Sequence, residues 1–223
     1  MESFTGFTEE TYRFFWELAF RNETEFFNEN RTRYEREVKA PLNKLALALS
    51  QTALLVDSSF NVRPAAVVSR IRRDTRFSKD KTLYRDHAFL VYKHYGQRTS
   101  ESYVLYAEFE RNAYGYGMGM YGPQTALMNA MHKRMLNEPE LFLSLVNEPA
   151  FKSRFSHHGV MYKRPRLTSA LKELQPWLNM RSLSFGFSSD KLQNTFEPEL
   201  VDEIKEGFML LKPVYRFIMG LEQ

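Results

Sequence analysis

The sequence predicts an α+β fold, in which a central, mainly antiparallel sheet over about residues 65–121 is flanked by N-terminal and C-terminal helices. Apolar residues recur at helical spacing up to about residue 56, and the same spacing returns after residue 121. Between these regions the pattern changes to short runs rich in Val, Leu, Tyr and Phe, which is typical of strands. No internal repeat or low-complexity linker divides the chain. We therefore expect residues 1–223 to form a single domain.

The N-terminal helices are expected from capping and spacing. Thr8 is a suitable N-cap, and Glu9 and Glu10 fall in the first turn, where negative charge favours a helix. A second helical region is expected to begin near Glu23. Pro41 interrupts its apolar face, so two helices should meet there.

The central strands are expected at residues 66–72, 88–95, 102–109 and 114–121. The last of these, YGYGMGMY, places aromatic and Met side chains on one face and glycines on the other. A bare strand face occurs where another backbone, a helix or a ligand comes very close, and a packed helix is the simplest explanation here.

The C-terminal region returns to the helical pattern. Pro123 and Pro139 suit the first turns of two helices, and a further helix is expected from Thr168. Residues 181–187 alternate as a short strand, and residues 197–221 should form a terminal helix.

The segment RIRRDTRFSKDKTLYRD, residues 70–86, carries seven basic side chains and three acids. The formal net charge of the whole chain is only +4, so the positive charge is concentrated locally. The segment lies between two expected strands, and we call it the basic loop. Arginine offers a planar fork that matches phosphate or carboxylate, and lysine offers a point charge. We predict that this loop binds an anion through Arg70, Arg72, Arg73, Arg76, Ser78, Lys79, Lys81 and Thr82.

A purely structural role for the same charges is the alternative. Asp74 and Asp80 could hold arginine side chains and thereby fix the shape of the loop without any ligand. Both roles can coexist if only part of the positive charge is neutralised.

Residues 73–82, RDTRFSKDKT, resemble the characteristic motif of an uncharacterised family of bacteria and fungi, the domain of unknown function 2461. Leu83 stands where that family usually has Pro. Residues 4–7, FTGF, resemble its F-x-G-F opening, and Tyr34 and Pro41 fit its Y-x-x-x-V-x-x-P pattern.

The resemblance continues at residues 22–27, NETEFF, which are similar to the family segment N-N-x-R-E-W-F. Thr24 replaces its Arg and Phe26 replaces its Trp. The resemblance covers essentially the whole chain and implies one continuous domain. It implies no activity, because the family has none established.

A secondary basic group follows the helical region, in a segment with no acid between Pro149 and Lys172. Its members are Arg154, His157, Lys163 and Arg164. If this segment folds against the basic loop, the two would form one cationic cleft.

Other motifs predict no cofactor, no metal and no assigned catalytic residue. Residues 117–122, GMGMYG, match G-x-G-x-x-G, but their glycines continue a strand-like period of two. Lys81 and Thr82 lack the glycines of a P-loop. The five histidines have no metal-ligand spacing. Ser78 lies beside lysines, but a hydroxyl that bonds the loop backbone explains it as well as a nucleophile does. The paired carboxylates Glu108 and Glu110 are explained as well by a solvated strand end.

The composition limits compartment and partners. The absence of cysteine excludes disulfides and fits a reducing compartment, and no secretory leader opens the chain, so we expect a cytoplasmic protein. No apolar run approaches the ~20 residues that cross a bilayer, so no membrane partner is expected. The sequence carries no signal for an oligomeric state.

The sequence thus predicts an uncharacterised protein that binds a phosphorylated or carboxylated small ligand at the basic loop. Whether that ligand is also transformed by an enzymatic reaction stays open. Single-stranded nucleic acid is another alternative, because aromatic residues are interleaved with basic ones around the loop. The last alternative is a structural ion-pair network that binds no ligand.

Overall fold

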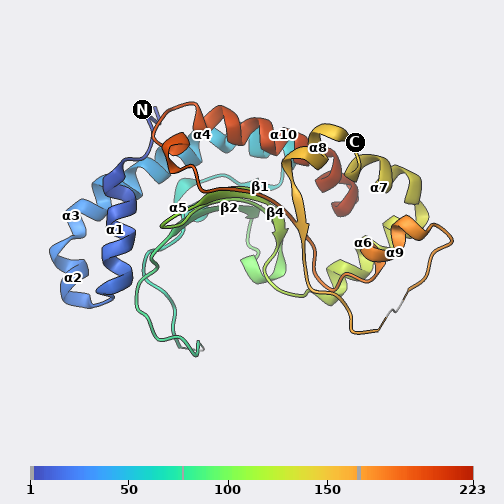
Figure 1. Ribbon diagram of the computed structural model, residues 1–223, viewed down its shortest axis with the longest axis horizontal. Coiled ribbons are helices and arrows are strands. Elements are labelled where there is room, and N and C mark those ends of the chain that lie inside the picture. Colours follow the sequence, from blue (N-terminus) through green and yellow to red (C-terminus); the bar gives the residue numbers. More distant parts are fainter. Residues whose placement is uncertain (1–2, 77, 165–166, 223) are drawn as a thin grey trace.

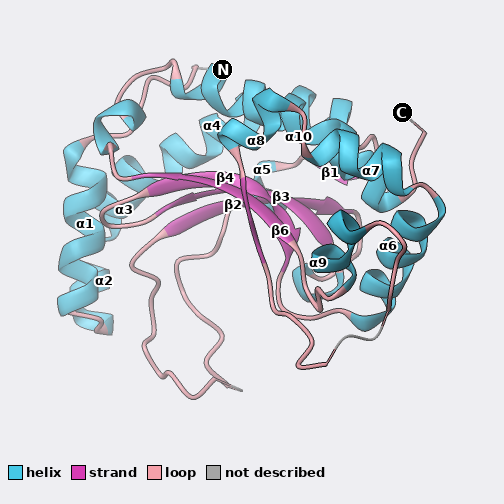
Figure 2. Ribbon diagram, turned by 45° about the vertical axis from the view of Figure 1, so that its right-hand side comes forward, coloured by secondary structure: helices cyan, strands magenta, loops and turns pink. Residues whose placement is uncertain are grey.

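The structure is a computed structural model that describes residues 3–76, 78–164 and 167–222. Within these residues, a six-stranded antiparallel sheet has the strand order β1-β2-β3-β4-β6-β5. Figure 2 shows the strands in magenta among the helices. The strands are β1 (Phe60–Asn61), β2 (Ala88–His94), β3 (Tyr103–Phe109), β4 (Tyr114–Met120), β5 (Ser156–His158) and β6 (Ser184–Ser189).

Most helices lie before β2 or after β4 in the sequence, as predicted, and the helices of residues 125–178 stand between β4 and β6. The N-terminal part contains α1 (Glu9–Phe20), α2 (Thr24–Glu29), α3 (Arg31–Tyr34), a π-helical turn (Glu35–Lys39), α4 (Ala40–Val56) and α5 (Pro64–Val67). The C-terminal part contains α6 (Thr125–Asn137), α7 (Pro139–Val146), α8 (Pro149–Arg154), α9 (Gln175–Leu178) and α10 (Leu200–Met219). Short 3-10 turns lie at Thr99–Glu101, Lys172–Leu174 and Leu192–Thr195.

One face of the sheet is covered by α4 and α10, which lie side by side across it (Figure 1). We call it the covered face. Its strands contribute large buried side chains such as Tyr92 and Tyr116, and α10 contributes Phe208. The hydroxyl of Tyr92 donates to the backbone oxygen of Ala46 in α4, at 2.8 Å. This face therefore holds the hydrophobic core.

No helix of the described residues covers the opposite face, which we call the open face (Figures 1 and 2). Strand alternation brings Phe89, Val91 and Lys93 of β2, and Tyr106 and Glu108 of β3, to this side. The glycines of β4 lie on the same side. A Cβ at Gly117 would be 2.1 Å from the backbone oxygen of Phe185 in β6. The bare face predicted from the sequence is thus filled by a neighbouring strand rather than by a helix.

The α+β class with flanking helices is confirmed, and three local expectations were wrong. The sheet extends beyond residues 65–121, because β5 and β6 add to it from the C-terminal part. Residues 66–72 are not a regular strand, since Pro64 opens the short helix α5 and only isolated bridges follow, Val68 with Leu90 and Arg72 with Tyr84. The helix expected from Thr168 is reduced to a 3-10 turn and α9.

No helix in the described part of the chain combines the length and the apolar character needed to cross a lipid bilayer.

Candidate anion-binding site

The basic loop leaves the sheet beside β2 and projects below the open face (Figure 1). At its base, the backbone N–H of Ser69 donates to the oxygen of Phe89 at 2.9 Å. Farther out, the N–H of Arg73 donates to the oxygen of Leu83 at 2.8 Å. These bonds pair the two arms of the loop as a narrow ribbon.

The returning arm is anchored to the N-terminal helices. Asn22, just after α1, donates to the backbone oxygen of Tyr84 at 2.9 Å and accepts from its N–H at 2.8 Å. The buried ring of Tyr84 stacks on Phe27 of α2 at 4.4 Å between centroids. The sequence segment around Asn22 thus positions the loop, a role that sequence reasoning missed.

Ion pairs within the loop neutralise part of its charge. Arg76 pairs with Asp74 at 2.7 Å, and Arg73 contacts both Asp80 and Thr82. Hydrogen bonds from Arg76 lower the pKa of Asp74 to about 2. The pKa of Asp80 is also lowered to about 2, first by the backbone N–H of Thr82 and then by Arg73. The structural alternative therefore accounts for these two arginines.

Lys81 also shapes the loop, because its Nζ donates to the backbone oxygen of Thr75 at 3.0 Å. Phe77 lies outside the described residues.

A cavity of about 580 Å³ lies between the loop and β2. We call it the basic pocket. Its cationic lining consists of Arg70, Arg72, Arg73, Arg76, Arg85 and Lys93, together with the acid Asp74. Its apolar lining includes Val67, Val68, Phe89 and Val91.

The basic pocket contains only part of the predicted site. Arg70, Arg72, Arg73 and Arg76 line it, whereas the lining does not include Ser78, Lys79, Lys81 or Thr82. Two of its cations were missing from the prediction. Arg85 returns with the second arm of the ribbon, and Lys93 shares the open face with Val91 through strand alternation, which was the available signal.

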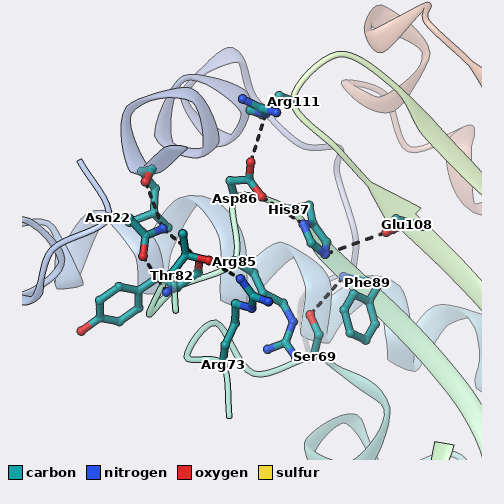
Figure 3. A network of polar contacts seen from close by, with 12 residues as sticks. Asn22, Ser69, Arg73, Thr82, Arg85, Asp86, His87, Phe89, Glu108 and Arg111 are labelled. Carbon is teal, nitrogen blue, oxygen red and sulfur yellow. Dashed lines mark hydrogen bonds and ion pairs between the residues drawn. The ribbon is translucent and has the colours of Figure 1, made fainter. Parts of the chain in front are cut away.

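Positive charge remains unneutralised in this pocket. The side chains of Arg70, Arg72 and Lys93 have no hydrogen-bond or ion-pair partner among the described residues. Arg85 has no acidic partner among them either, and it donates to the backbone oxygen of Arg70 at 2.6 Å. Burial, and then repulsion by Arg73, lower the pKa of Arg85. Figure 3 shows the side chains of Arg73 and Arg85 close together, beside Ser69 and Phe89.

An acid–base cluster lies next to the pocket (Figure 3). Glu108 is the cross-strand partner of Phe89, which lines the pocket. The Nε2 of His87 lies 4.0 Å from Glu108, and its Nδ1 lies 3.2 Å from Asp86. Burial raises the pKa of Glu108, and repulsion by Glu110 adds to the effect.

The secondary basic group does not join the basic loop. β5 lies at the opposite edge of the sheet from β1, with β3, β4 and β6 between it and β2, so the single cationic cleft is not formed. Arg154 instead packs on the covered side, where its Nε donates to the hydroxyl of Tyr116 at 2.7 Å and its Nη2 lies 3.4 Å from Glu203.

The other members of that group follow the same edge of the sheet. The ring of His157 lies 4.8 Å from that of Trp177. Lys163 and Arg164 are exposed in the segment after β5. The described residues hold no group of three or more His, Asp or Glu side chains placed to ligate a metal ion.

The glycine motif and the interleaved aromatics also have defined places. Gly117 and Gly119 belong to strand β4 and form no phosphate turn. The rings of Tyr84, Tyr92 and Tyr103 are buried in the core. These three rings offer no stacking surface to a nucleic acid, whereas Tyr95 is 72% exposed and Tyr106 is half-buried on the open face.

Comparison with known proteins adds one finding. Among curated proteins, none matches this chain. A family model described as conserved hypothetical protein (DUF2461) matches residues 10–217, so the chain belongs to that family.

Proposed function

We propose that this protein binds a small organic anion, phosphorylated or carboxylated, in the basic pocket. The observation that carries the proposal is the pocket of about 580 Å³ in which Arg70, Arg72 and Lys93 have no partner among the described residues. Its volume is in the range of cavities that hold small-molecule ligands. Guanidinium groups that are already gathered, but not neutralised, bind phosphate or carboxylate with charge-assisted hydrogen bonds.

The framework around the pocket supports binding because it preorganises these cations. The Asp74–Arg76 and Asp80–Arg73 pairs hold the tip of the loop, and Asn22 holds its returning arm. The entropic cost of gathering the cations is therefore met during folding and not during binding. An arriving anion also relieves the repulsion between Arg73 and Arg85.

An enzyme that acts on such a ligand is the second candidate. The observation that favours it is the pair His87 and Glu108, which lies beside the pocket wall formed by Phe89. A carboxyl group with a raised pKa, close to an imidazole, can exchange a proton with a bound substrate. The nucleic-acid alternative is less well supported, since Tyr84, Tyr92 and Tyr103 are in the core and Tyr95 is the one exposed ring of the interleaved aromatics among the described residues.

A thermal-shift screen of phosphorylated and carboxylated metabolites tests the proposal. Compounds that stabilise the wild type are then tested on the double variant Arg70→Gln with Arg72→Gln. These side chains make no hydrogen bond or ion pair within the described residues, so the variant should fold normally and lose most of the ligand-induced shift. Arg76 and Lys81 are poorer targets, because their loss would also disturb the loop.

Lys79→Gln is the matched control. Lys79 is an exposed cation of the same loop that does not line the pocket, so its removal should leave the shift nearly intact. If no compound stabilises the wild type more than the double variant, the proposal is wrong.

A further inference from the structure

We infer that the ligand of the basic pocket is an organic polyphosphate, with at least two linked phosphate groups attached to a planar or apolar group, as in a nucleoside diphosphate. This inference rests on the proposed function and narrows its ligand class. Three properties of the pocket support it: its uncompensated charge, the direction of its arginines and its apolar wall.

The first property is charge. Asp74 forms an ion pair with Arg76, and Asp80 forms one with Arg73. Among the described residues, this leaves the side chains of Arg70, Arg72, Arg85 and Lys93 in the pocket without an acidic partner. One phosphate monoester carries a charge of about −1.5 to −2 at neutral pH. It would leave a substantial part of this positive charge unneutralised, whereas a second phosphate group would compensate more of it.

The second property is direction. Ile71 packs against the hydrophobic core, while Arg70 and Arg72 on either side of it are exposed. In an extended arm, residues two positions apart point to the same side and lie about 7 Å apart along the backbone. Lys93 approaches from a different element, β2. The cations therefore surround the pocket from several sides, which suits a chain of phosphates better than one compact anion.

The third property is the apolar wall. Val67, Val91 and the ring of Phe89 line the pocket together with the cations. The guanidinium carbon of Arg85 lies 5.5 Å from the centroid of the Phe89 ring. Val67 and Val91 are already buried, but a purely inorganic polyanion would leave the half-buried Phe89 ring in contact with water. A planar group such as a nucleobase would cover it and could stack on the exposed part of the ring.

Isothermal titration calorimetry, without divalent metal, tests the inference with four probes: inorganic phosphate, pyrophosphate, AMP and ADP. We expect pyrophosphate to bind about tenfold more tightly than phosphate, and ADP to bind more tightly than both AMP and pyrophosphate. In the double variant Arg70→Gln with Arg72→Gln, the preference for two phosphates over one should largely disappear. In Lys79→Gln it should persist. Lys93→Gln should also weaken this preference. It provides an independent test, because Lys93 lies on β2, outside the loop.

The outcomes separate this inference from the proposed function. If none of the probes and no carboxylated metabolite binds, the proposed function itself fails. If phosphate and pyrophosphate bind equally well, the pocket binds anions and the polyphosphate inference is wrong. If ADP binds no more tightly than pyrophosphate, the inference that the ligand carries a planar or apolar group is wrong. A short oligothymidine that binds more tightly than ADP, with a steeper dependence on salt, would overturn the inference in favour of nucleic acid.

Discussion

The two faces of the sheet use the same strands for opposite purposes. On the covered face, Tyr92 and Tyr116 are fully buried, and their hydroxyl groups are held by Ala46 and Arg154. The open face carries the glycines of β4 and the half-buried Tyr106 of β3, and Phe89, Val91 and Lys93 of β2 line the basic pocket there. Strand alternation alone therefore separates the surface that packs into the core from the surface that faces the basic pocket. Mutations of side chains packed on the covered side should therefore affect stability strongly, whereas those at open-face positions with room for a side chain should affect it only weakly.

The largest effect is expected at Asp57, between α4 and α10 on the covered side. Asp57 is 2% exposed and accepts hydrogen bonds from Tyr215 at 3.0 Å and from the backbone of Ser59 at 2.9 Å. Its carboxylate also lies 2.7 Å from Nε2 of His94. Asp57→Ala leaves these groups without their partner, so we expect the free energy of unfolding in urea to fall by about 3–5 kcal/mol.

The pH dependence of this loss provides a check. Burial raises the pKa of Asp57, but hydrogen bonds from His94, Ser59 and Tyr215 together lower it below its ordinary value. A lowered folded-state pKa contributes stability above the unfolded-state value of about 4, and this stability is lost as pH falls through the folded-state value. The gap between wild type and variant should therefore narrow below about pH 4. Asp202→Ala removes an exposed ion pair with Lys205 and should cost less than about 1 kcal/mol.

The next effect compares two glycines that each face a tyrosine. A Cβ at Gly207 in α10 would lie 2.3 Å from the ring of Tyr116, which is buried on the covered face. Alanine gains about 1 kcal/mol in helix propensity, but overpacking costs about 1–3 kcal/mol. Because Arg154 holds the ring in place, we expect Gly207→Ala to lower the free energy of unfolding.

On the open face, a Cβ at Gly186 would meet only the hydroxyl of Tyr106, at 2.7 Å. That hydroxyl is the end of a partly exposed side chain, which can move. We expect Gly186→Ala to change the free energy of unfolding by less than about 0.5 kcal/mol. Equal losses for the two variants in urea denaturation would contradict the division between the faces.

The sequence predicted the layers of this fold better than its long-range pairing. Helical spacing identified α1, α4 and α10, and alternation identified β3, β4 and the region of β6. The pairing of β4 with β6 joins Gly117 to Gly186, and nothing local in the sequence specifies such a distant partner. For the same reason, the expected boundary of the sheet near residue 121 was too early.

The candidate site shows a similar limit. Local charge identified the basic loop, and the nearby acids Asp74 and Asp80 were recognised as partners for its arginines. The sequence did not show which cations stay unneutralised, because that depends on distances in the fold. Arg154 was grouped with other basic residues, yet Glu203, far along the chain, compensates it. Lys93 entered the pocket only through its place on β2.

The last effect, which is also small, is expected at Glu108, on the open face. Burial, with repulsion by Glu110, raises the pKa of this carboxyl group. A raised folded-state pKa means that the contribution to stability is present at low pH and is lost as pH rises through the folded-state value. Glu108→Gln removes the ionised form, so the variant should gain stability relative to wild type as pH rises from about 4 to 7.

The side chain of Glu108 is 38% exposed, so solvent screening limits this gain to roughly 0.5 kcal/mol, or about 1–2 °C in Tm. Thermal melts at several pH values measure it. Glu110→Gln leaves Glu108 in place and removes only the repulsion, so it should give a smaller change of the same sign. A difference between Glu108→Gln and wild type that is constant with pH, or that grows as pH falls, would show that this carboxyl group is solvated like an ordinary surface acid. It would then lose the one property that favours it as a proton donor to a ligand in the basic pocket.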